Sequence, residues 1–365
     1  NNYDGEMVVN SAETWDFDIR VYKNIRIVSG GTLNLTCNLT MSPTGKIIVE
    51  DGGKLNVDGG KITSVCDLWD GIEVWGNRNQ GQGNVSTTGQ GLATFKNSAE
   101  VSNAQTVVTT IKTDPITDIW DWNKTGGIIQ AENSSFINNI RSFQFLSYHN
   151  FRTGYPSQYR NNISYIHNCI FNVTNNLIYP YKHHYADITM YDVQGISIKG
   201  NTFTNTAPSS IYTSLSEKGA GIISIDSRFN LSPLGTDRNV FENLWYGVYC
   251  SNSVSANSLS ISNTDFTDCN TSVYANNINF LRIWGNNFHV PIRSPKSPDL
   301  NVPSVGIYLD NCPSYLIENN SISSTVTGDA NYGMYVVNSG DQPNYVYNNT
   351  IDGFKTAGII AYDVN

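Results

Sequence analysis

The residues best suited to acid–base chemistry are crowded into the middle of the 365-residue chain. Four of the five histidines fall within 36 residues, among arginines and tyrosines. A polysaccharide lyase needs a base to remove the proton beside a uronate carboxylate, a cation to neutralise that carboxylate, and often a tyrosine to protonate the leaving oxygen. The candidates for these roles are Tyr148, His149, Arg152, Lys182 and His183.

The same crowding also fits polar and aromatic loop residues that pack on the outside of the fold without catalysing anything. Adjacent residues on a strand point to opposite faces, so His183 and His184 can serve one site only from a loop. The sequence contains no recognisable Ser-His-Asp, phosphate-loop or dinucleotide motif. We therefore rank catalysis below binding and keep both hypotheses.

A second candidate is an acidic segment with two tryptophans. Asp114, Asp118 and Asp121 lie beside Trp120 and Trp122, a mixture that could hold a structural calcium ion or grip a sugar. The spacing does not match an EF-hand loop. A solvated acidic loop anchored by the two indole rings is the competing interpretation, and we expect no other cofactor.

The element that must position these residues is visible as a repeat. A glycine followed by Ile, Val or Met and then Ile or Tyr recurs at steps of 26, 25, 34, 27 and 25 residues, with Ser272 replacing the glycine once. The glycines are Gly221, Gly247, Gly306, Gly333 and Gly358. A period of this length, rich in β-branched and aromatic residues, predicts one coil of a solenoid per repeat.

A second register ends in Phe or Ile and runs between the first. Its members are Phe136, Phe171, Phe203, Phe241, Phe266, Phe288, Ile322 and Ile351. Three residues before each lies Asn or Gly, except for Arg238. Asn and Gly best tolerate a left-handed backbone, so these positions predict corners between short strands that stack at about 4.8 Å.

Strand alternation predicts which side chains of the first register face inward. The core column comprises Ile222, Val248, Val273, Ile307, Met334 and Ile359. The outward neighbours Tyr249, Tyr274, Tyr308 and Tyr335 then form an aromatic stripe on which sugar rings could stack. The alternative is that stacking of these rings stabilises the sheet, or that a loop covers them.

Over nearly its whole length the chain resembles the pectate-lyase-like superfamily. The resemblance implies an all-β fold, a single-stranded right-handed parallel β-helix of about a dozen coils. The turns Gly30-Gly31-Thr32-Leu33 and Gly52-Gly53-Lys54-Leu55, with the phrase from Trp69 to Asn77, are similar to surface β-helix proteins of Bacteroidota exported by the type IX secretion system. That similarity implies one module of a larger multidomain surface protein.

The spacings also predict the organisation of the chain. Residues 1–24 are expected to be an initial strand or cap, and residues 25–365 the β-helix. Coils up to about residue 100 are expected to be compact, with loop insertions around 100–215, where the steps lengthen to 35 and 32 residues. Loops on a rigid scaffold often carry function.

Bulk composition narrows the function classes. The chain has 22 Lys and Arg against 31 Asp and Glu, a net charge of −9, and no basic stripe, which argues against nucleic acid as a partner. No apolar run is long enough to cross a membrane. The N-terminus does not read as a signal peptide, so we expect any export signal to have been removed.

The six cysteines form no CxxC pair, which argues against zinc or redox use. Cys37 and Cys66 are about one coil apart and could form a disulfide between adjacent coils. Cys250 falls in a core position and is predicted to be a buried free thiol.

We therefore predict a secreted or outer-surface bacterial β-helix that binds a polysaccharide or cell-surface glycan, or serves as an adhesive or stalk-like module. The alternative is a polysaccharide lyase acting on an acidic polysaccharide through the central loops. A purely structural spacer would need neither an exposed stripe nor a cationic pocket.

Overall fold

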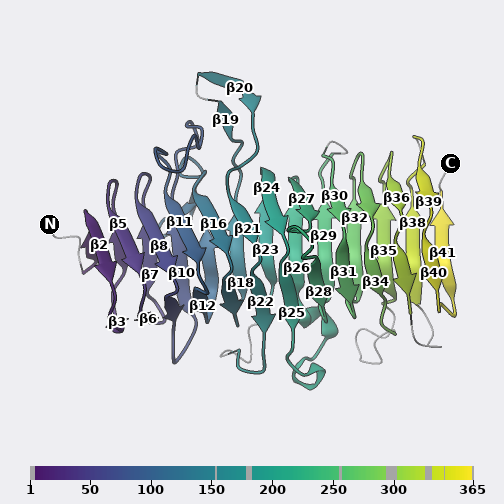
Figure 1. The fold of residues 1–365 in the computed structure, drawn as a ribbon, viewed down its shortest axis with the longest axis horizontal. Coiled ribbons are helices and arrows are strands. Elements are labelled where there is room, and N and C mark those ends of the chain that lie inside the picture. The colour runs from purple at the N-terminus through teal and green to yellow at the C-terminus, as the bar shows by residue number, and fades with distance from the viewer. Residues whose placement is uncertain are drawn as a thin grey trace. The chain divides into compact units, whose positions relative to one another are not determined.

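The computed structural model describes residues 5–152, 154–177, 183–254, 257–292, 302–324, 331–340 and 342–363. In this part of the chain the regular structure is short β-strands and two 3₁₀ helices, with no α-helix. Each coil contributes one strand to each of three parallel sheets, whose strands are labelled in Figure 1. This confirms the predicted right-handed parallel β-helix.

Among the described residues, the first sheet has 13 strands. In sheet order they are β1 (Met7–Val9), β4 (Ile25–Ile27), β7 (Lys46–Val49), β10 (Trp69–Val74), β13 (Ala104–Thr109), β18 (Arg141–Phe145), β23 (Ala186–Tyr191), β26 (Ala220–Ile225), β29 (Tyr246–Ser251), β32 (Thr271–Asn276), β35 (Ser304–Asp310), β38 (Asn331–Val337) and β41 (Ala357–Tyr362).

The second sheet has 12 strands over the same described ranges. They are β2 (Ala12–Trp15), β5 (Thr32–Leu35), β8 (Lys54–Asp58), β11 (Leu92–Lys96), β16 (Ile128–Glu132), β21 (Tyr165–His167), β24 (Gln194–Lys199), β27 (Arg228–Ser232), β30 (Ser260–Ser262), β33 (Arg282–Trp284), β36 (Leu316–Glu318) and β39 (Tyr345–Tyr347).

The third sheet also has 12 strands in the described structure. They are β3 (Ile19–Val21), β6 (Asn38–Met41), β9 (Lys61–Thr63), β12 (Glu100–Ser102), β17 (Ser135–Ile137), β22 (Ile170–Val173), β25 (Thr202–Asn205), β28 (Asn239–Glu242), β31 (Thr264–Thr267), β34 (Asn287–His289), β37 (Ser321–Ser323) and β40 (Thr350–Asp352).

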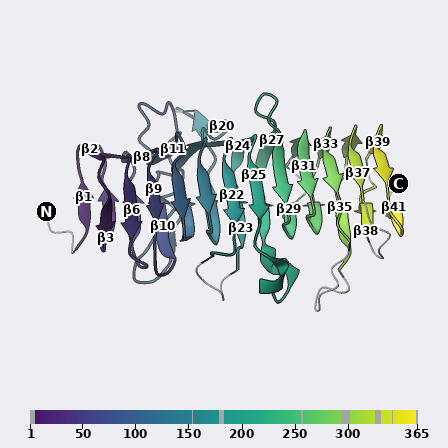
Figure 2. The ribbon, with the colours of Figure 1, turned by 60° about the horizontal axis from the view of Figure 1, so that its bottom comes forward.

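The coils are organised in two compact units. The first comprises residues 1–171, 176–182 and 188–197, and the second comprises residues 172–175, 183–187 and 198–365. The first unit carries two antiparallel hairpins, β14 (Lys112–Thr113) with β15 (Trp120–Asp121) and β19 (Phe151–Arg152) with β20 (Tyr155–Tyr159). The second carries the 3₁₀ helices η1 (Ser209–Ile211) and η2 (Leu215–Lys218) after β25, seen below that strand in Figure 2.

The core of the second unit follows the predicted alternation. Ile222, Val248, Val273, Ile307 and Met334 pair in register and are fully buried. The sixth predicted member, Ile359, is 50% exposed, because its strand β41 is the last in the first sheet and is covered on one side only. Burial of this column stabilises each coil by the hydrophobic effect.

The repeated glycine has a packing reason. Phenylalanine rings of the third sheet stack nearly parallel down the interior, with centroid distances of 4.5, 5.1 and 4.9 Å along Phe203, Phe241, Phe266 and Phe288. A Cβ atom at Gly221 would lie only 2.5 Å from the Phe241 ring. Gly221 and Gly247 therefore leave room for the rings of Phe241 and Phe266, and the small residue Ser272 takes the same position in the next coil.

The corners confirm the predicted left-handed backbone. The asparagines and glycines of the second register have positive φ at Asn133, Asn168, Gly200, Asn263, Gly285, Asn319 and Asn348. Asparagines one residue further on bond from coil to coil, with Asn286 Nδ2 donating to Asn320 Oδ1 and Asn320 Nδ2 donating to Asn349 Oδ1, both at 2.9 Å. These bonds supply partners for buried polar groups.

The structure describes the N-terminal part in more detail than the spacings do. Residues 7–21, within the segment expected to be an initial strand or cap, form β1, β2 and β3 and pair with the following coil in all three sheets. The coils before residue 100 are not all compact, because a long loop separates β10, which ends at Val74, from β11, which begins at Leu92.

All six cysteines are free. Cys250 is buried, as predicted for a core thiol. The disulfide considered between Cys37 and Cys66 is not present in the structure. Cys37 is buried and Cys66 is exposed.

Candidate functional site

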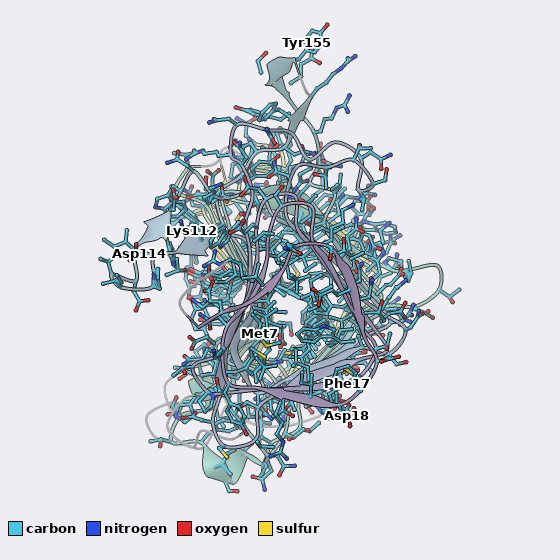
Figure 3. All side chains as sticks on the ribbon, turned by 90° about the vertical axis from the view of Figure 1, so that its left-hand side faces the viewer. Met7, Phe17, Asp18, Lys112, Asp114 and Tyr155 are labelled. Carbon is cyan, nitrogen blue, oxygen red and sulfur yellow. The ribbon has the colours of Figure 1, made fainter. Side chains whose placement is uncertain are left out.

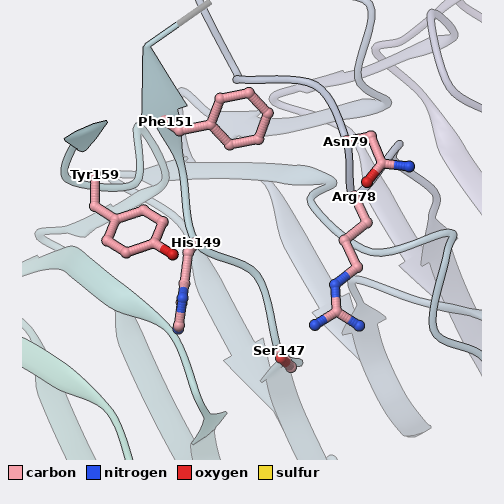
Figure 4. A pocket seen from close by; sticks show the side chains of 6 residues that line it. All are labelled: Arg78, Asn79, Ser147, His149, Phe151 and Tyr159. Atoms are coloured by element: carbon pink, nitrogen blue, oxygen red, sulfur yellow. The ribbon is translucent and has the colours of Figure 1, made fainter. Parts of the chain in front are cut away.

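A pocket of about 450 Å³ lies in the first unit, between two segments that are far apart in sequence. The loop after β10 supplies Arg78 and Asn79, and the chain leaving β18 supplies Ser147, His149, Phe151 and Tyr159. Figure 4 shows His149 and Tyr159 on one side and Arg78 and Asn79 on the other, with Ser147 below.

Buried glutamines hold the loop after β10 in place. Gln90 Oε1 accepts from the Asn77 backbone N–H at 2.6 Å, and its Nε2 donates to the Asn77 carbonyl at 3.0 Å. Gln82 accepts from the Ile163 N–H at 2.9 Å, while the Gln82 N–H donates to Asn150 Oδ1 at 2.9 Å. Both glutamines are fully buried, so these bonds fix the loop against the segment that carries His149.

Tyr148 anchors this arrangement and does not line the pocket. Its side chain is 2% exposed, and its hydroxyl donates to the Gln80 carbonyl at 2.6 Å. A Cβ at Gly126 would lie 2.6 Å from the Tyr148 ring, so the glycine makes room for it. Burial raises the pKa of Tyr148 well above its usual value.

His149 is held by a carboxylate. Its Nε2 lies 2.7 Å from Asp192 Oδ1, and Ser147 Oγ donates to Asp192 Oδ2 at 2.6 Å. The hydrogen bond to Asp192 raises the pKa of His149, although partial burial and the nearby Arg78 act in the opposite direction. Burial raises the pKa of Asp192, but the bonds from His149 and Ser147 outweigh it and leave that pKa lowered.

This geometry is not that of a serine nucleophile. A catalytic serine must bond to the histidine that takes its proton, whereas Ser147 donates to the carboxylate that also holds His149. Asp192 instead favours the imidazolium form of His149. The pocket therefore combines the Arg78 guanidinium with an imidazole whose protonated form is favoured by the carboxylate behind it.

Aromatic side chains complete the walls. The His149 and Tyr159 rings meet edge to face at a centroid distance of 5.1 Å, and Phe151 pairs with Tyr159 in the β19–β20 hairpin. Arg152, a predicted site residue, is exposed, and its guanidinium lies 4.8 Å from the centre of the Tyr155 ring. Figure 3 shows Tyr155 at the projecting end of this hairpin.

The other central candidates are placed elsewhere or not described. Lys182 lies outside the described residues. His183 belongs to the second unit, with Nε2 3.5 Å from Glu217 Oε2 and its ring 6.1 Å from that of Tyr212. A single site that unites His149 with Lys182 and His183 stays a prediction.

The tyrosine stripe exists as a ladder. Successive rings of Tyr249, Tyr274, Tyr308 and Tyr335 are nearly parallel, with centroid distances of 4.7, 5.0 and 5.2 Å. All four side chains are half-buried. Each interior ring has both faces covered by its neighbours, so ring edges and hydroxyls are what the ladder offers to a ligand.

The acidic hairpin uses its carboxylates internally. Asp114 Oδ1 accepts from the backbone N–H groups of Thr117 and Ile116 at 2.9 and 3.0 Å, which lowers its pKa. Asp121 accepts from the Asn123 N–H at 3.1 Å, and Asp118 has a left-handed backbone. In the described ranges no three His, Cys, Asp or Glu side chains group to hold a metal ion.

The two tryptophans of this hairpin are partly exposed. Trp120 and Trp122 meet edge to face at 5.6 Å, and Trp122 contacts Tyr191 in the same way at 6.3 Å. Figure 3 shows that Lys112 and Asp114 lie on a hairpin that projects from the body of the first unit. Whether this hairpin binds a sugar stays a prediction.

A polar groove of about 680 Å³ crosses the second sheet of the first unit. Its floor includes outward side chains that are in register on neighbouring strands: Asn34, Asn56, Thr94, Gln130 and Tyr165. Asn56 bonds to Asn34 at 2.9 Å and to Thr94 at 2.8 Å, which leaves a row of amides and hydroxyls on the surface.

Sequence reasoning missed Arg78, Asn79 and Asp192. One signal was available for the first two: the 17 residues between Val74 and Leu92 are rich in Gly, Asn and Gln and continue neither register. Asp192 had no such signal, because its role depends on contact with residues about 45 positions earlier.

Comparison with a protein-family model supports the fold over residues 186–365. Residues 186–365 match the family model described as the right handed beta helix region. The chain is similar to the crystal structure of a periplasmic alginate epimerase, AlgG, at 13% identity and a TM-score of 0.40, covering 94% of this chain and 77% of that one. It is also similar to PfbA, a surface adhesin of Streptococcus pneumoniae, at 12% identity and a TM-score of 0.33, covering 92% and 85%.

No curated protein sequence matches the chain. The structural likenesses concern the fold alone. Within the described residues, no helix has the length and apolar character required to span a membrane.

Proposed function

We propose that the protein is a glycan-binding module whose pocket in the first unit receives a carboxylated sugar. The observation that carries this proposal is the convergence of Arg78 and His149 in one cavity, with Asp192 favouring the charged form of the imidazole. Two cations beside two aromatic side chains suit a ring that has one acidic substituent and one apolar face.

Each group has a role in recognising such a ligand. A guanidinium binds a carboxylate through paired hydrogen bonds, so Arg78 is the principal anion contact. With Nε2 of His149 bonded to Asp192, the Nδ1–H of the imidazolium is the donor that can reach a ligand. Phe151 and Tyr159 cover the apolar face, and the amide of Asn79 can bond to a hydroxyl.

A polysaccharide lyase is the second candidate function. It is favoured by the presence of a histidine, an arginine and a tyrosine in the same cavity. A catalytic base must be unprotonated, however, and the bond to Asp192 raises the pKa of His149 and occupies one ring nitrogen. The bond to Asp192 makes His149 a weaker base but a better donor to an anion, so we rank binding above lyase activity.

Calorimetric titration with oligosaccharides of alginate and of polygalacturonate tests the proposal. Arg78→Gln should weaken binding about tenfold or more, because a charge-assisted bidentate contact is worth roughly 1.5–3 kcal/mol. Arg152→Gln is the matched control, since it removes the same charge from an exposed position on the neighbouring hairpin. Equal affinity of wild type and Arg78→Gln, or equal losses in both variants, would contradict a specific site.

We further propose that this module acts outside the cell, as one part of a larger surface protein with an adhesive or stalk-like role. The similarity of the Gly-Gly turns to those of Bacteroidota surface proteins supports export by the type IX system. A structural calcium ion at the acidic hairpin is proposed on the clustering of Asp114, Asp118 and Asp121 in one segment, although their spacing does not match an EF-hand loop. A fall in melting temperature on adding EDTA would support that ion.

A further inference from the structure

A second pocket, of about 480 Å³, is built entirely within the second unit. It is lined by one loop from each of three consecutive coils, after β32, β35 and β38. The lining residues are Asn279, Phe280, Asn311, Pro313, Ser314, Asn338, Gly340 and Gln342. None of these described residues carries a charge, in contrast to the pocket of the first unit.

Phe280 is anomalous for its position. It has a φ of +55° and is 64% exposed. A left-handed backbone is uncommon for any residue with a side chain and is a clear outlier for a bulky one. An exposed phenylalanine in that conformation neither buries apolar area nor relaxes the backbone, so folding stability does not explain it.

The neighbouring coil shows what the fold itself requires here. Asn276 pairs with Asp310, which aligns Phe280 with Ser314, and Ser314 has the same left-handed backbone with a φ of +59°. The flanking residues of the two loops are matched and buried, Ile278 with Cys312 and Leu281 with Tyr315. A small polar residue, Ser314, adopts this left-handed backbone in the next coil, so the fold does not require an aromatic side chain at position 280. Strained residues of this kind cluster at ligand sites.

The polar side of the pocket is held by bonds within the loops. Asn344 Oδ1 accepts from the Tyr315 N–H at 3.1 Å, and its Nδ2 donates to the Ser339 carbonyl at 2.6 Å. Asn338 Nδ2 donates to Asp310 Oδ1 at 3.0 Å. These bonds fix Asn338 and Asn344 in the loop after β38, and Gln342 of the same loop also lines the cavity that Phe280 borders.

We propose that this second pocket binds an uncharged sugar ring. The apolar face of a pyranose stacks on the exposed Phe280 ring, and its hydroxyls bond to the amides of Asn338 and Gln342 and to the Ser314 hydroxyl. The Asp310 carboxylate, which accepts from Asn338 beside the pocket, disfavours an acidic sugar, whereas the amides and hydroxyl of the lining suit a neutral one. The proposal is independent of the carboxylate pocket, since the two sites share no residue and differ in ligand charge.

The decisive variant is Phe280→Ser, which copies the residue that the next coil uses at the same corner. Binding would be measured on an array of neutral and acidic glycans and by calorimetry with the neutral glycans that bind. We expect about five- to tenfold weaker binding of neutral glycans, unchanged binding of acidic ones, and a melting temperature equal to or above that of wild type. Gln342→Ala should weaken the same glycans without changing the melting temperature.

Phe17→Ser is the matched control, because Phe17 is 59% exposed and lies in the first unit. It should leave glycan binding unchanged. The proposal fails if the wild type binds no neutral glycan, if Phe280→Ser binds as the wild type does, or if Phe280→Ser lowers the melting temperature as a packing residue would. Binding of an aromatic-rich peptide array in place of glycans would also overturn it.

Discussion

At the scale of single residues, Asp192 decides the chemistry of the first pocket. It bonds simultaneously to His149 and Ser147, and its own backbone carbonyl accepts from the Tyr148 N–H at 3.2 Å. The residue occupies a left-handed corner, with a φ of +51°, which aims the carboxylate at the segment leaving β18. This carboxylate favours the protonated imidazole and occupies its Nε2, so His149 is not placed to activate Ser147 as a nucleophile.

The first prediction is that binding of acidic glycans weakens as the pH rises. Because Asp192 raises the pKa of His149, the imidazolium persists to higher pH than in an ordinary histidine and is lost above its raised pKa. Affinity for alginate oligosaccharides should therefore hold below the ordinary histidine pKa of 6.5 and fall as the pH rises through the raised pKa of His149. His149→Gln should bind more weakly at low pH and show a flat profile. A flat wild-type profile would remove His149 from the site.

A second residue-scale prediction concerns Asp187, which is buried in the second unit. Its Oδ2 has no hydrogen-bond partner, and its Oδ1 lies 3.7 Å from His184 Nε2. Burial raises the pKa of Asp187 well above its usual value. Between the unfolded and folded pKa values, the folded state keeps a proton that the unfolded state has lost, so stability falls as the pH rises.

Asp187→Asn keeps the shape and removes this titration. We expect the variant to be more stable than wild type at neutral pH, because its folded state no longer has to keep a proton that the unfolded chain releases. The two proteins should converge in acid. Thermal melts recorded at several pH values test this. A less stable variant at neutral pH would instead indicate an ion pair with His184.

At the scale of the elements, the tyrosine ladder runs across four neighbouring strands of the first sheet, β29, β32, β35 and β38. Burial raises the pKa of Tyr274 to about 12 and raises that of Tyr308 in the same direction. Stacking of the rings on one another leaves their edges and hydroxyls at the surface. This geometry favours a stabilising role over the sugar-stacking role predicted from alternation alone.

The third prediction follows from that geometry. Tyr274→Leu removes two stacked contacts and should lower the free energy of unfolding by about 1–3 kcal/mol, at 0.5–1.5 kcal/mol per aromatic pair. Tyr345→Leu, at an exposed site on β39, should change it by less than about 0.5 kcal/mol. Melting temperatures compare the two. Loss of glycan binding in Tyr274→Leu with an unchanged melting temperature would show instead that the tyrosine stripe is a binding surface.

At the scale of the whole molecule, the net charge affects how an acidic polysaccharide would be bound. The chain carries a net charge of −9, so an acidic polysaccharide is repelled at long range and must be held by local cations such as Arg78. This makes the predicted binding specific to the pocket and different from the diffuse attraction of a basic protein.

The fourth prediction concerns turnover by the intact protein. A lyase acting on uronates leaves an unsaturated product that absorbs in the ultraviolet. Incubation with pectate, alginate or glycosaminoglycans should give no rise in absorbance, because the bond to Asp192 favours the protonated form of His149 and occupies one of its ring nitrogens. An increase that disappears in His149→Gln would reverse the ranking of binder and lyase.

The repeating architecture is encoded locally along the chain. Left-handed corners at residues such as Asn263 and Asn319, and alternation along strands such as β32, depend on neighbours a few residues apart, so they leave a periodic trace in the chain. The core column and the outward tyrosines can therefore be assigned from the repeat alone. Only Ile359 departs from that column, because exposure at the last strand of a sheet depends on what stacks beyond it.

The candidate sites, in contrast, can be located only in the folded chain. Arg78, His149 and Asp192 are separated by 71 and 43 residues and meet because loops of irregular length fold onto neighbouring coils. The ladder rings cover one another's faces through the spacing between strands, and Phe280 departs from its corner only when set beside Ser314 on the next coil. A sequence repeat reflects interactions between residues that are close in the chain. A binding site depends on contacts between coils and insertions, and these contacts do not recur at a fixed spacing.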